Sequence, residues 1–273
     1  MAKSEQFQVV EVLTQGDKPV GRKQIMTPSP VKLCAQKYNL PLWQGEKLKE
    51  KLADFQSLKA DFLVVIAYGK IIPQSILDCF SYTINLHGSI LPKYRGASPI
   101  QMAVLNGNLE TGVSVMQMVK AMDAGPVYEI HKMPILAEDS SADIFQKMGD
   151  LAAQNLLTDL INIANGKMPV AQEENQATYC EKISKEDGLL DFSKYTALEC
   201  LNRLRAFTPW PGVYFEYESL PIKVLSAQIL KNPLVTSFAK SGFLTKDHTY
   251  FLPLTIVPAG KKAMNFADWA REK

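Results

Sequence analysis

The stretch INLHGSILP, residues 84–92, is where a short apolar strand runs directly into clustered polar groups and then into a turn. Asn85 and His87 are two residues apart, so on an extended strand their side chains point to the same face. An amide donor beside an imidazole can stabilise a developing oxyanion and move a proton. The stretch therefore predicts a polar site at the end of a strand.

A turn and a helix start follow this strand. The turn is LPKYRG (residues 91–96), and SPIQ (residues 98–101) then predicts a helix with Ser98 as N-cap and Gln101 closing a capping box. A strand end, a polar pair, a turn and a helix in this order are typical of the active-site edge of an α/β protein.

The segments around this strand alternate between short apolar runs and helical patterns, which indicates the α/β class. Residues 61–67 form an unbroken apolar run after Asp61, and this predicts a parallel strand covered on both faces. Further strands are predicted at residues 8–14, 40–43, 112–119 and 126–135, and helices at residues 30–38, 46–55 and 141–164.

At 273 residues the chain is long enough for one large and one small domain. Residues 167–186 contain Pro169 and a run of Gln, Glu and Asn, so they predict an exposed linker. This linker would separate a catalytic domain at residues 1–166 from a domain at residues 187–273. The second domain has a helical pattern at residues 197–206 and then short β-like runs, which predict a small barrel.

The composition excludes several classes of protein. A hydrophobic content of 47% and a charged content of 21% are ordinary for a soluble globular protein. A net charge of +2 does not by itself indicate a nucleic-acid binder, so any such surface must come from local clustering. The four cysteines are scattered without C-x-x-C spacing, which favours reduced thiols over a zinc site or a disulfide framework. Neither a signal peptide nor an apolar run of about 20 residues is visible, so we expect the cytoplasm.

Several motifs resemble the folate-dependent formyltransferases. The pattern of that family is an Asn, a His two residues on, a Ser-Leu-Leu-Pro-like turn and a downstream Asp before Gly, matched here by NLHGSILPKYRG and by MDAG at residues 122–125. Ile90 stands where Leu is usual. Further matches are TQGDKPVGR (14–22), PSPVK (28–32), FTPWPG (207–212) and PAGKKAM (258–264). PSPVK and the two C-terminal blocks favour the branch that formylates initiator methionyl-tRNA.

The resemblance, which runs from about Val9 to Met264, implies a fold and a reaction. The fold is a Rossmann-like formyltransferase domain with a mostly parallel sheet, followed by a small OB-like β-barrel domain that helps hold tRNA. The reaction transfers a formyl group from 10-formyltetrahydrofolate, as co-substrate, to the amino group of initiator methionyl-tRNA. We expect a monomer, and the absence of a His, Asp and Glu cluster with ligand spacing argues against a metal.

Formyl transfer needs a deprotonated amine, an oxyanion donor and a proton for the departing folate nitrogen. The resemblance assigns Asn85 as the oxyanion donor, His87 as the proton-transfer or oxyanion partner, and Asp123 as the carboxylate that orients or charges His87. By position alone, Asn85 and His87 could instead cap backbone groups. Asp123 could equally be a turn residue.

The resemblance also points to residues that bind the folate. These are Tyr68, Gly69, Ser89, Ile90, Leu91 and Pro92. Lys93 and Arg95 could hold a phosphate or the folate tail, or could simply be exposed in a turn.

For tRNA, the resemblance points to Lys18, Arg22 and Lys23. They lie in a loop between residues 15 and 40 that carries five basic residues against the single acid Asp17. From spacing alone this loop could be a solvated surface.

Two alternatives stay open. One is another 10-formyltetrahydrofolate enzyme, such as a glycinamide ribonucleotide formyltransferase or a formyl-folate hydrolase, although the barrel-like domain disfavours it. The other is a catalytically silent tRNA- or folate-binding paralogue, because the family has a strand, a turn and a helix before Val9. We expect Met1 to be an internal methionine of a longer reading frame. The strands at 8–14 and 61–67 would then lack the strand between them in a doubly wound sheet.

Overall fold

The computed structural model describes residues 4–21, 23–45, 47–231 and 237–271. The chain divides into two compact units. Unit 1 comprises Met1–His87, Val115–Glu129 and Asn155–Ala171, and unit 2 comprises Gly88–Ser114, Ile130–Gln154 and Gln172–Lys273. Within the described ranges, no helix is both long and apolar enough to cross a membrane.

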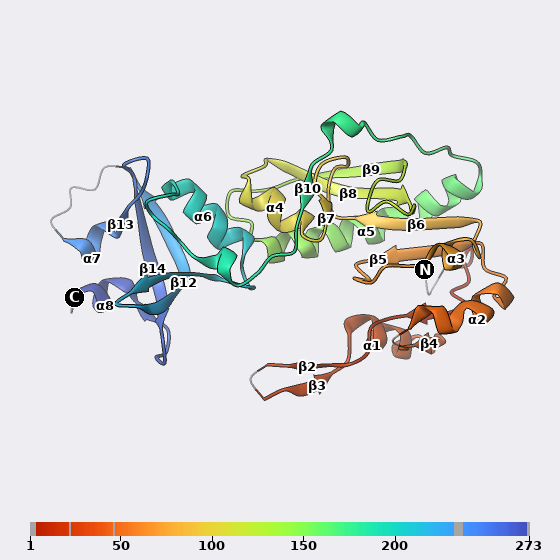
Figure 1. Ribbon diagram of the computed structural model, residues 1–273, viewed down its shortest axis with the longest axis horizontal. Helices are drawn as coiled ribbons and strands as arrows, with labels where there is room; N and C mark the ends of the chain where they lie inside the picture. The colour runs from red at the N-terminus through yellow and green to blue at the C-terminus, as the bar shows by residue number, and fades with distance from the viewer. Residues whose placement is uncertain (1–3, 22, 46, 232–236, 272–273) are drawn as a thin grey trace. The chain divides into compact units, whose positions relative to one another are not determined.

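The central sheet has four strands in the order β5-β6-β8-β9 (Figure 1). Its strands are β5 (Phe62–Ile66), β6 (Tyr82–His87), β8 (Glu110–Gln117) and β9 (Val127–Pro134). β5 and β6 are parallel, and Ile66 pairs with Leu86, so both strands end at the same edge. A mixed α/β unit with a mostly parallel sheet confirms the predicted class.

β5 is less buried than its sequence predicts. Four of its side chains are half-buried and Ile66 is 55% exposed, so the prediction of a strand covered on both faces is wrong. β1 (Val12–Leu13) pairs in parallel with β4 (Leu42–Trp43) in a separate sheet and does not pair with β5. Within the described residues β5 is therefore an edge strand, and its apolar side chains have fewer neighbours to cover them.

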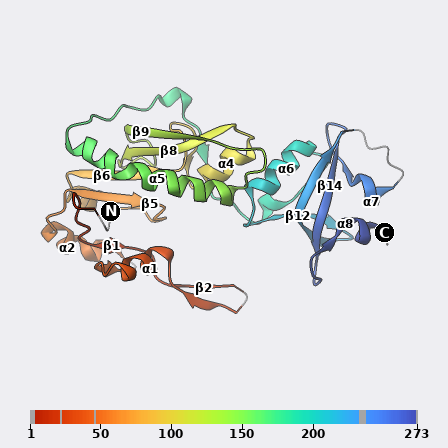
Figure 2. The same ribbon diagram turned by 180° about the vertical axis from the view of Figure 1, so that it is seen from behind.

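Short elements surround these strands in unit 1. Helix α1 (Pro30–Lys37) begins as predicted, because the Ser29 side chain accepts a hydrogen bond from the backbone of Lys32 and proline stands in the first turn. Strands β2 and β3 form a hairpin that extends away from α1 (Figures 1 and 2). The remaining elements are β2 (Lys18–Val20), β3 (Ile25–Thr27), the 3-10 helix η1 (Leu48–Lys51), α2 (Leu52–Ser57) and α3 (Gln74–Leu77). The helix predicted at residues 46–55 is thus divided between η1 and α2.

The longer helices follow their sequence signals. Helix α5 (Ser141–Ala164) has the predicted bounds, and α6 (Ala197–Ala206) begins with a capping box between Thr196 and Glu199. Helix α4 (Pro99–Leu105) differs. Ser98, with φ −137° and ψ 47°, makes no capping bond with its side chain, so the predicted capping box there is wrong. Its backbone is not in the extended conformation that N-cap residues usually adopt.

The C-terminal part of unit 2 is a sheet of antiparallel strands. The path is β11-β12-β14-β13, with β15 paired to β14. Phe215, Phe251 and Phe266 are almost fully buried and form the centre of its core. The strands are β11 (Val213–Tyr217), β12 (Leu220–Leu230), β13 (Phe243–Leu244), β14 (Tyr250–Pro258) and β15 (Met264–Asn265), and the helices are α7 (Phe238–Ser241) and α8 (Phe266–Arg271).

A second pairing in unit 2 joins segments far apart in the sequence. Strand β7 (Arg95–Gly96) lies parallel to β10 (Tyr179–Cys180), so the segment predicted as a linker adds a strand beside the turn that follows β6. The short helices η2 (Glu174–Gln176) and η3 (Glu186–Gly188) stand on either side of β10 in the chain. Part of the predicted linker is thus held by backbone hydrogen bonds.

Candidate active site

The predicted polar pair stands at the end of β6, in unit 1. Thr83, Asn85 and His87 alternate with the buried Ile84 and Leu86 along this strand. Asn85 and His87 therefore point to the same side of the sheet, as their spacing predicts. Asn85 is half-buried and His87 is 6% exposed, so the imidazole is largely shielded from water.

Asp123 lies beside His87. Its Oδ2 is 3.6 Å from Nδ1 of His87, and the carboxylate side chain is 17% exposed. This separation permits an electrostatic interaction but is longer than a good hydrogen bond. Catalytic hydrogen bonds are often long before substrate binds. A carboxylate near Nδ1 fixes the imidazole orientation and leaves Nε2 for chemistry.

The loop after β8 places Asp123. The backbone N–H of Gln117 donates to the carbonyl oxygen of Pro126 at 2.9 Å and closes the base of this loop. Asp123 has φ +51°, a left-handed conformation that Asp tolerates better than most residues. At Gly125, an added Cβ would meet the carbonyl oxygen of Gln117, so this position needs glycine. The MDAG motif is therefore a loop whose shape carries the acid to the imidazole.

The loop after β5 begins at the same edge of the sheet. Ala67 has φ +48° and Gly69 has φ +70°, so the chain turns sharply around Tyr68. The side-chain amide of Gln15 donates to the carbonyl oxygen of Tyr68 at 2.7 Å. The Tyr68 hydroxyl oxygen is buried and has no hydrogen-bond partner within the described part of the chain. Burial raises the pKa of Tyr68, so the phenol stays neutral and can donate to an acceptor on a ligand.

The turn after His87 belongs to unit 2 and is fixed from within. The Ser89 hydroxyl donates to the carbonyl oxygen of Lys93 at 2.6 Å, and Ser89 is fully buried. The Ser114 hydroxyl donates to the carbonyl oxygen of Ser89 at 2.7 Å and accepts from the N–H of Leu91 at 3.1 Å. Ser114 was not predicted from the sequence, because nothing in a Ser on a strand 25 residues away indicates this contact.

Arg95 is neither of the things that its sequence position allowed. It is 1% exposed, and its guanidinium makes two bonds to the carboxylate of Glu174, at 2.7 and 2.9 Å. It also donates twice to the side-chain oxygen of Gln172 and once to the hydroxyl of Tyr179. The carboxylate of Glu174 raises the pKa of Arg95, so the charge is retained. Arg95 therefore holds the segment around β10 against the turn, and does not hold a ligand.

The basic loop forms the β2-β3 hairpin. Asp17, its single acid, is bound by the ammonium of Lys32 at 2.8 Å and by Gln44, which lower the pKa of Asp17. Lys18 and Lys23 remain on the exposed hairpin. Arg22 lies outside the described residues. Exposed apolar side chains accompany these lysines, namely Val20, Ile25 and Met26.

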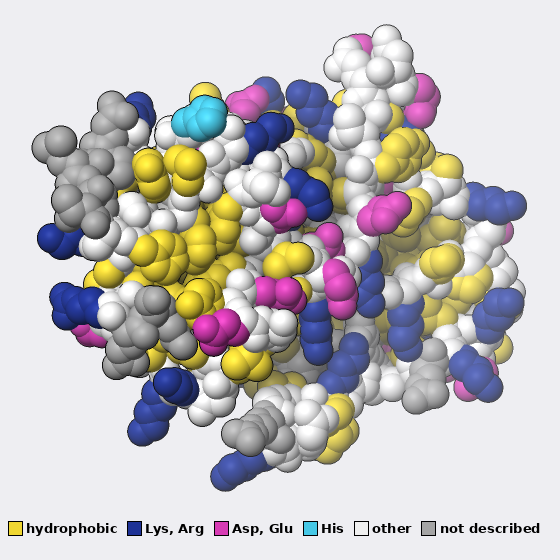
Figure 3. Space-filling view, turned by 60° about the vertical axis from the view of Figure 1, so that its left-hand side comes forward, with side chains coloured by type: hydrophobic (Ala, Val, Ile, Leu, Met, Phe, Trp, Pro, Cys, Tyr) yellow, Lys and Arg dark blue, Asp and Glu magenta, His cyan; other side chains and the backbone are white. Residues whose placement is uncertain are grey.

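Figure 3 shows one face of the molecule on which Lys and Arg side chains are scattered among Asp and Glu side chains. That face has no single continuous basic area, in keeping with the small net charge of +2. The hairpin in unit 1 is thus the best-defined local group of basic side chains that the sequence predicted.

The other reactive side chains do not form a site. All four cysteines are free, and burial raises the pKa of the Cys200 thiol to about 12, which makes it unreactive. Among the residues that the structure describes, no three His, Cys, Asp or Glu side chains come together in a way that could hold a metal ion.

Comparison with known proteins identifies two family matches along the chain. Residues 1–160 match the formyl transferase family, and residues 182–273 match the formyl transferase C-terminal domain. A protein of Hydrogenovibrio crunogenus named methionyl-tRNA formyltransferase is 37% identical over 98% of this chain and 89% of its own length.

Solved structures share the fold. The methionyl-tRNA formyltransferase of Clostridium thermocellum superposes with a TM-score of 0.59 at 17% identity, covering 86% of this chain and 90% of that one. HypX of Aquifex aeolicus, solved in complex with tetrahydrofolic acid, gives a TM-score of 0.62 at 17% identity. The match covers 87% of this chain but only 43% of HypX, so this chain spans less than half of that protein.

The contacts of Arg95 give a testable expectation. Arg95→Ala should lower the free energy of unfolding by at least about 2 kcal/mol, because Gln172 and Tyr179 lose their buried partner. Arg95→Lys keeps the charge but not the planar fork, and should recover only part of this loss. Urea denaturation measures the stability, and limited proteolysis should cut the segment 172–180 faster in both variants. A parent-like cleavage rate in Arg95→Ala would show that Arg95 does not hold this segment.

Proposed function

The chain belongs to the methionyl-tRNA formyltransferase family, and on this premise we propose that it transfers the formyl group of 10-formyltetrahydrofolate to the amino group of initiator methionyl-tRNA. This reaction would serve translation initiation. The observation that carries the proposal is the approach of Asp123 to His87, at the strand end that also bears Asn85.

The site residues take complementary roles in this reaction. The side-chain amide of Asn85 donates to the oxygen of the formyl group as the carbon becomes tetrahedral. His87, oriented by Asp123, accepts the proton that the attacking amine loses and delivers it to the folate nitrogen that departs. The carbon–nitrogen bond to the amine forms and the bond to the folate nitrogen breaks. No covalent intermediate with the protein is needed.

The folate contacts are a proposal for each unit. In unit 1 we propose Tyr68 and Gly69, where the buried Tyr68 hydroxyl can donate to a ligand. In unit 2 we propose the turn residues Ser89, Ile90, Leu91 and Pro92. Since the Ser89 hydroxyl is used by Lys93, Ser89 would contact the folate through its backbone. The complex of HypX with tetrahydrofolic acid supports a folate co-substrate for this fold.

The remaining expectations are also proposals. We propose that the chain acts as a monomer in the cytoplasm. Its division would run from a catalytic part (1–166) through a connecting segment (167–186) to a tRNA-binding part (187–273). The two other 10-formyltetrahydrofolate activities are disfavoured, because the relative from H. crunogenus carries the methionyl-tRNA formyltransferase name over nearly the whole chain. The catalytically silent alternative is decided by the activity assays below.

Asn85→Ala should reduce the formylation rate by about 10²- to 10³-fold, which is the usual loss for one oxyanion donor. Folding should change little, because Asn85 is only half-buried. The measurement is steady-state formylation of methionyl-tRNA by the variant and the parent, with thermal melts as the control for folding. A folded variant with the parent's rate would remove Asn85 from the site.

Asp123→Asn should be at least as damaging as the loss of Asn85. The amide keeps the shape of the side chain but removes the negative charge that supports His87 as a proton acceptor. The pH dependence of the rate should therefore change together with its maximum. If both the rate and the pH profile matched the parent, Asp123 would be only a turn residue.

The hairpin lysines separate a tRNA enzyme from a small-molecule enzyme. Replacing Lys18 and Lys23 by Ala should weaken tRNA binding and reduce its salt dependence, since each lost phosphate contact lowers the slope by up to about 0.9 for duplex. Folate affinity should stay unchanged. Lys59→Ala, an exposed lysine elsewhere in unit 1, is the control. Equal salt slopes in the hairpin variant and the parent would show that this loop is solvated surface.

A further inference from the structure

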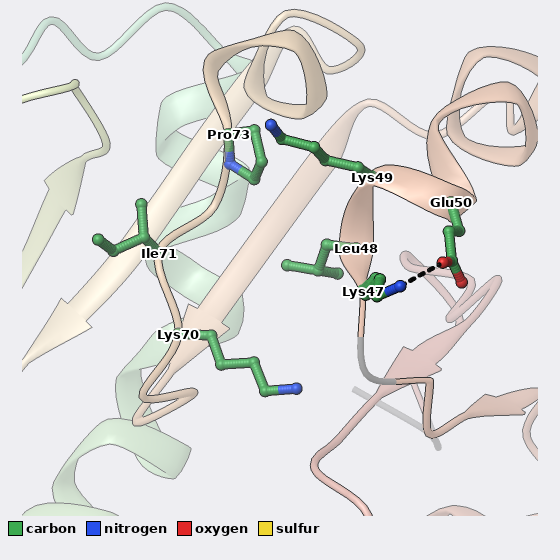
Figure 4. Close-up of a pocket in the computed structure, with 7 residues that line it drawn as sticks. All are labelled: Lys47, Leu48, Lys49, Glu50, Lys70, Ile71 and Pro73. Atoms are coloured by element: carbon green, nitrogen blue, oxygen red, sulfur yellow. Dashed lines mark ion pairs between the residues drawn. The ribbon is translucent and has the colours of Figure 1, made fainter.

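Unit 1 contains a pocket that neither the predicted catalytic residues nor the predicted folate residues line. Its volume is about 470 Å³, and Figure 4 shows that two segments face each other across it. One segment is the start of η1 and the other is the loop after β5. The lining residues are Lys47, Leu48, Lys49, Glu50, Lys70, Ile71 and Pro73.

The pocket is positively charged. Three lysines line it against one acid, and that acid, Glu50, lies 3.5 Å from Lys47 on the exposed rim. Lys49 makes no ion pair with a described residue, and its ammonium points toward Pro73 across the pocket (Figure 4). Lys70 extends from the opposite segment (Figure 4). A ligand that fits this charge carries more than one anionic group.

The pocket also has apolar walls. Leu48 is buried beneath it, and Ile71 is 94% exposed beside it. A fully exposed Ile gains by contact with a ligand that has aliphatic segments between its charges. A compact inorganic anion would leave this apolar surface uncovered, so a chain of alternating methylene groups and carboxylates suits the pocket better.

The position of the pocket connects it to the candidate active site. β5 and β6 are parallel and end at one edge, where β6 presents Asn85 and His87. The loop that leaves β5 at this edge carries first Tyr68 and Gly69, then Lys70, Ile71 and Pro73. A folate that reacts at the end of β6 and passes Tyr68 would extend its far end along this loop. Arg95 does not compete for that end, because Glu174 and Gln172 occupy its guanidinium.

We propose that this pocket binds the γ-glutamyl tail of the folate co-substrate, and that Lys49 and Lys70 make the protein prefer folates with several γ-glutamate residues. The inference rests on the proposed function. Each added γ-glutamate supplies one carboxylate for the lysines and two methylene groups for Leu48 and Ile71. The lysines therefore act on the length of the tail and not on the reacting carbon.

The test compares two probes, tetrahydrofolate with one glutamate and tetrahydrofolate with four. Isothermal titration at low salt would measure their dissociation constants for the parent, for the double variant Lys49→Ala with Lys70→Ala, and for Lys59→Ala as the matched control. The parent should bind the four-glutamate probe about tenfold more tightly, since each exposed charge pair contributes a few-fold. The double variant should reduce this ratio to about twofold or less, whereas Lys59→Ala should keep it. Added salt should narrow the ratio in the parent.

Three results would overturn the inference. The parent could bind both probes equally, the double variant could keep the parent's ratio, or it could lose tRNA affinity in place of tail discrimination. If methionyl-tRNA is formylated while tail length has no effect, the inference fails and the proposed function stands. If neither probe binds and no formylation occurs, both fail.

Discussion

The parallel pairing of β5 and β6 is the constraint on which the site depends. Because the two strands run in the same direction and stay in register to Ile66 and Leu86, their last residues and the loops that follow them start from one edge. Polar groups can be exposed there, since the backbone ladder no longer requires apolar neighbours. The imidazole, the amide and the sharp turn at Tyr68 all lie at this edge or directly after it.

Much of this arrangement follows from local sequence. Helix α5 has its predicted bounds because its apolar spacing is long and regular, and α6 begins where Thr196 and Glu199 cap it. The spacing of Asn85 and His87 settles that they share a face, since alternation along a strand leaves no other choice. Ser98 shows the limit of such reasoning. Its motif suits a helix cap, but its observed backbone conformation does not allow the capping bond.

The parts that local sequence could not predict depend on contacts between distant segments. Nothing near Arg95 indicates Glu174, which lies 79 residues away and converts a surface-like turn residue into a buried one. The lysines of η1 look like a solvated helix face until the loop after β5 is placed opposite them. The half-buried state of β5 is of the same kind, because an apolar run does not reveal how many neighbours its strand will have.

The pairing of β7 with β10 has a consequence for how this chain tolerates changes in length. Tyr179 and Cys180 are in register with Arg95 and Gly96, and the carbonyl oxygen of Cys180 sits where a side chain at residue 96 would be. One inserted residue just before Tyr179 would reverse which side chains face the turn. Loop grafts, tags and natural length variation should therefore accumulate outside residues 172–180, even though the composition there resembles that of a freely adjustable spacer.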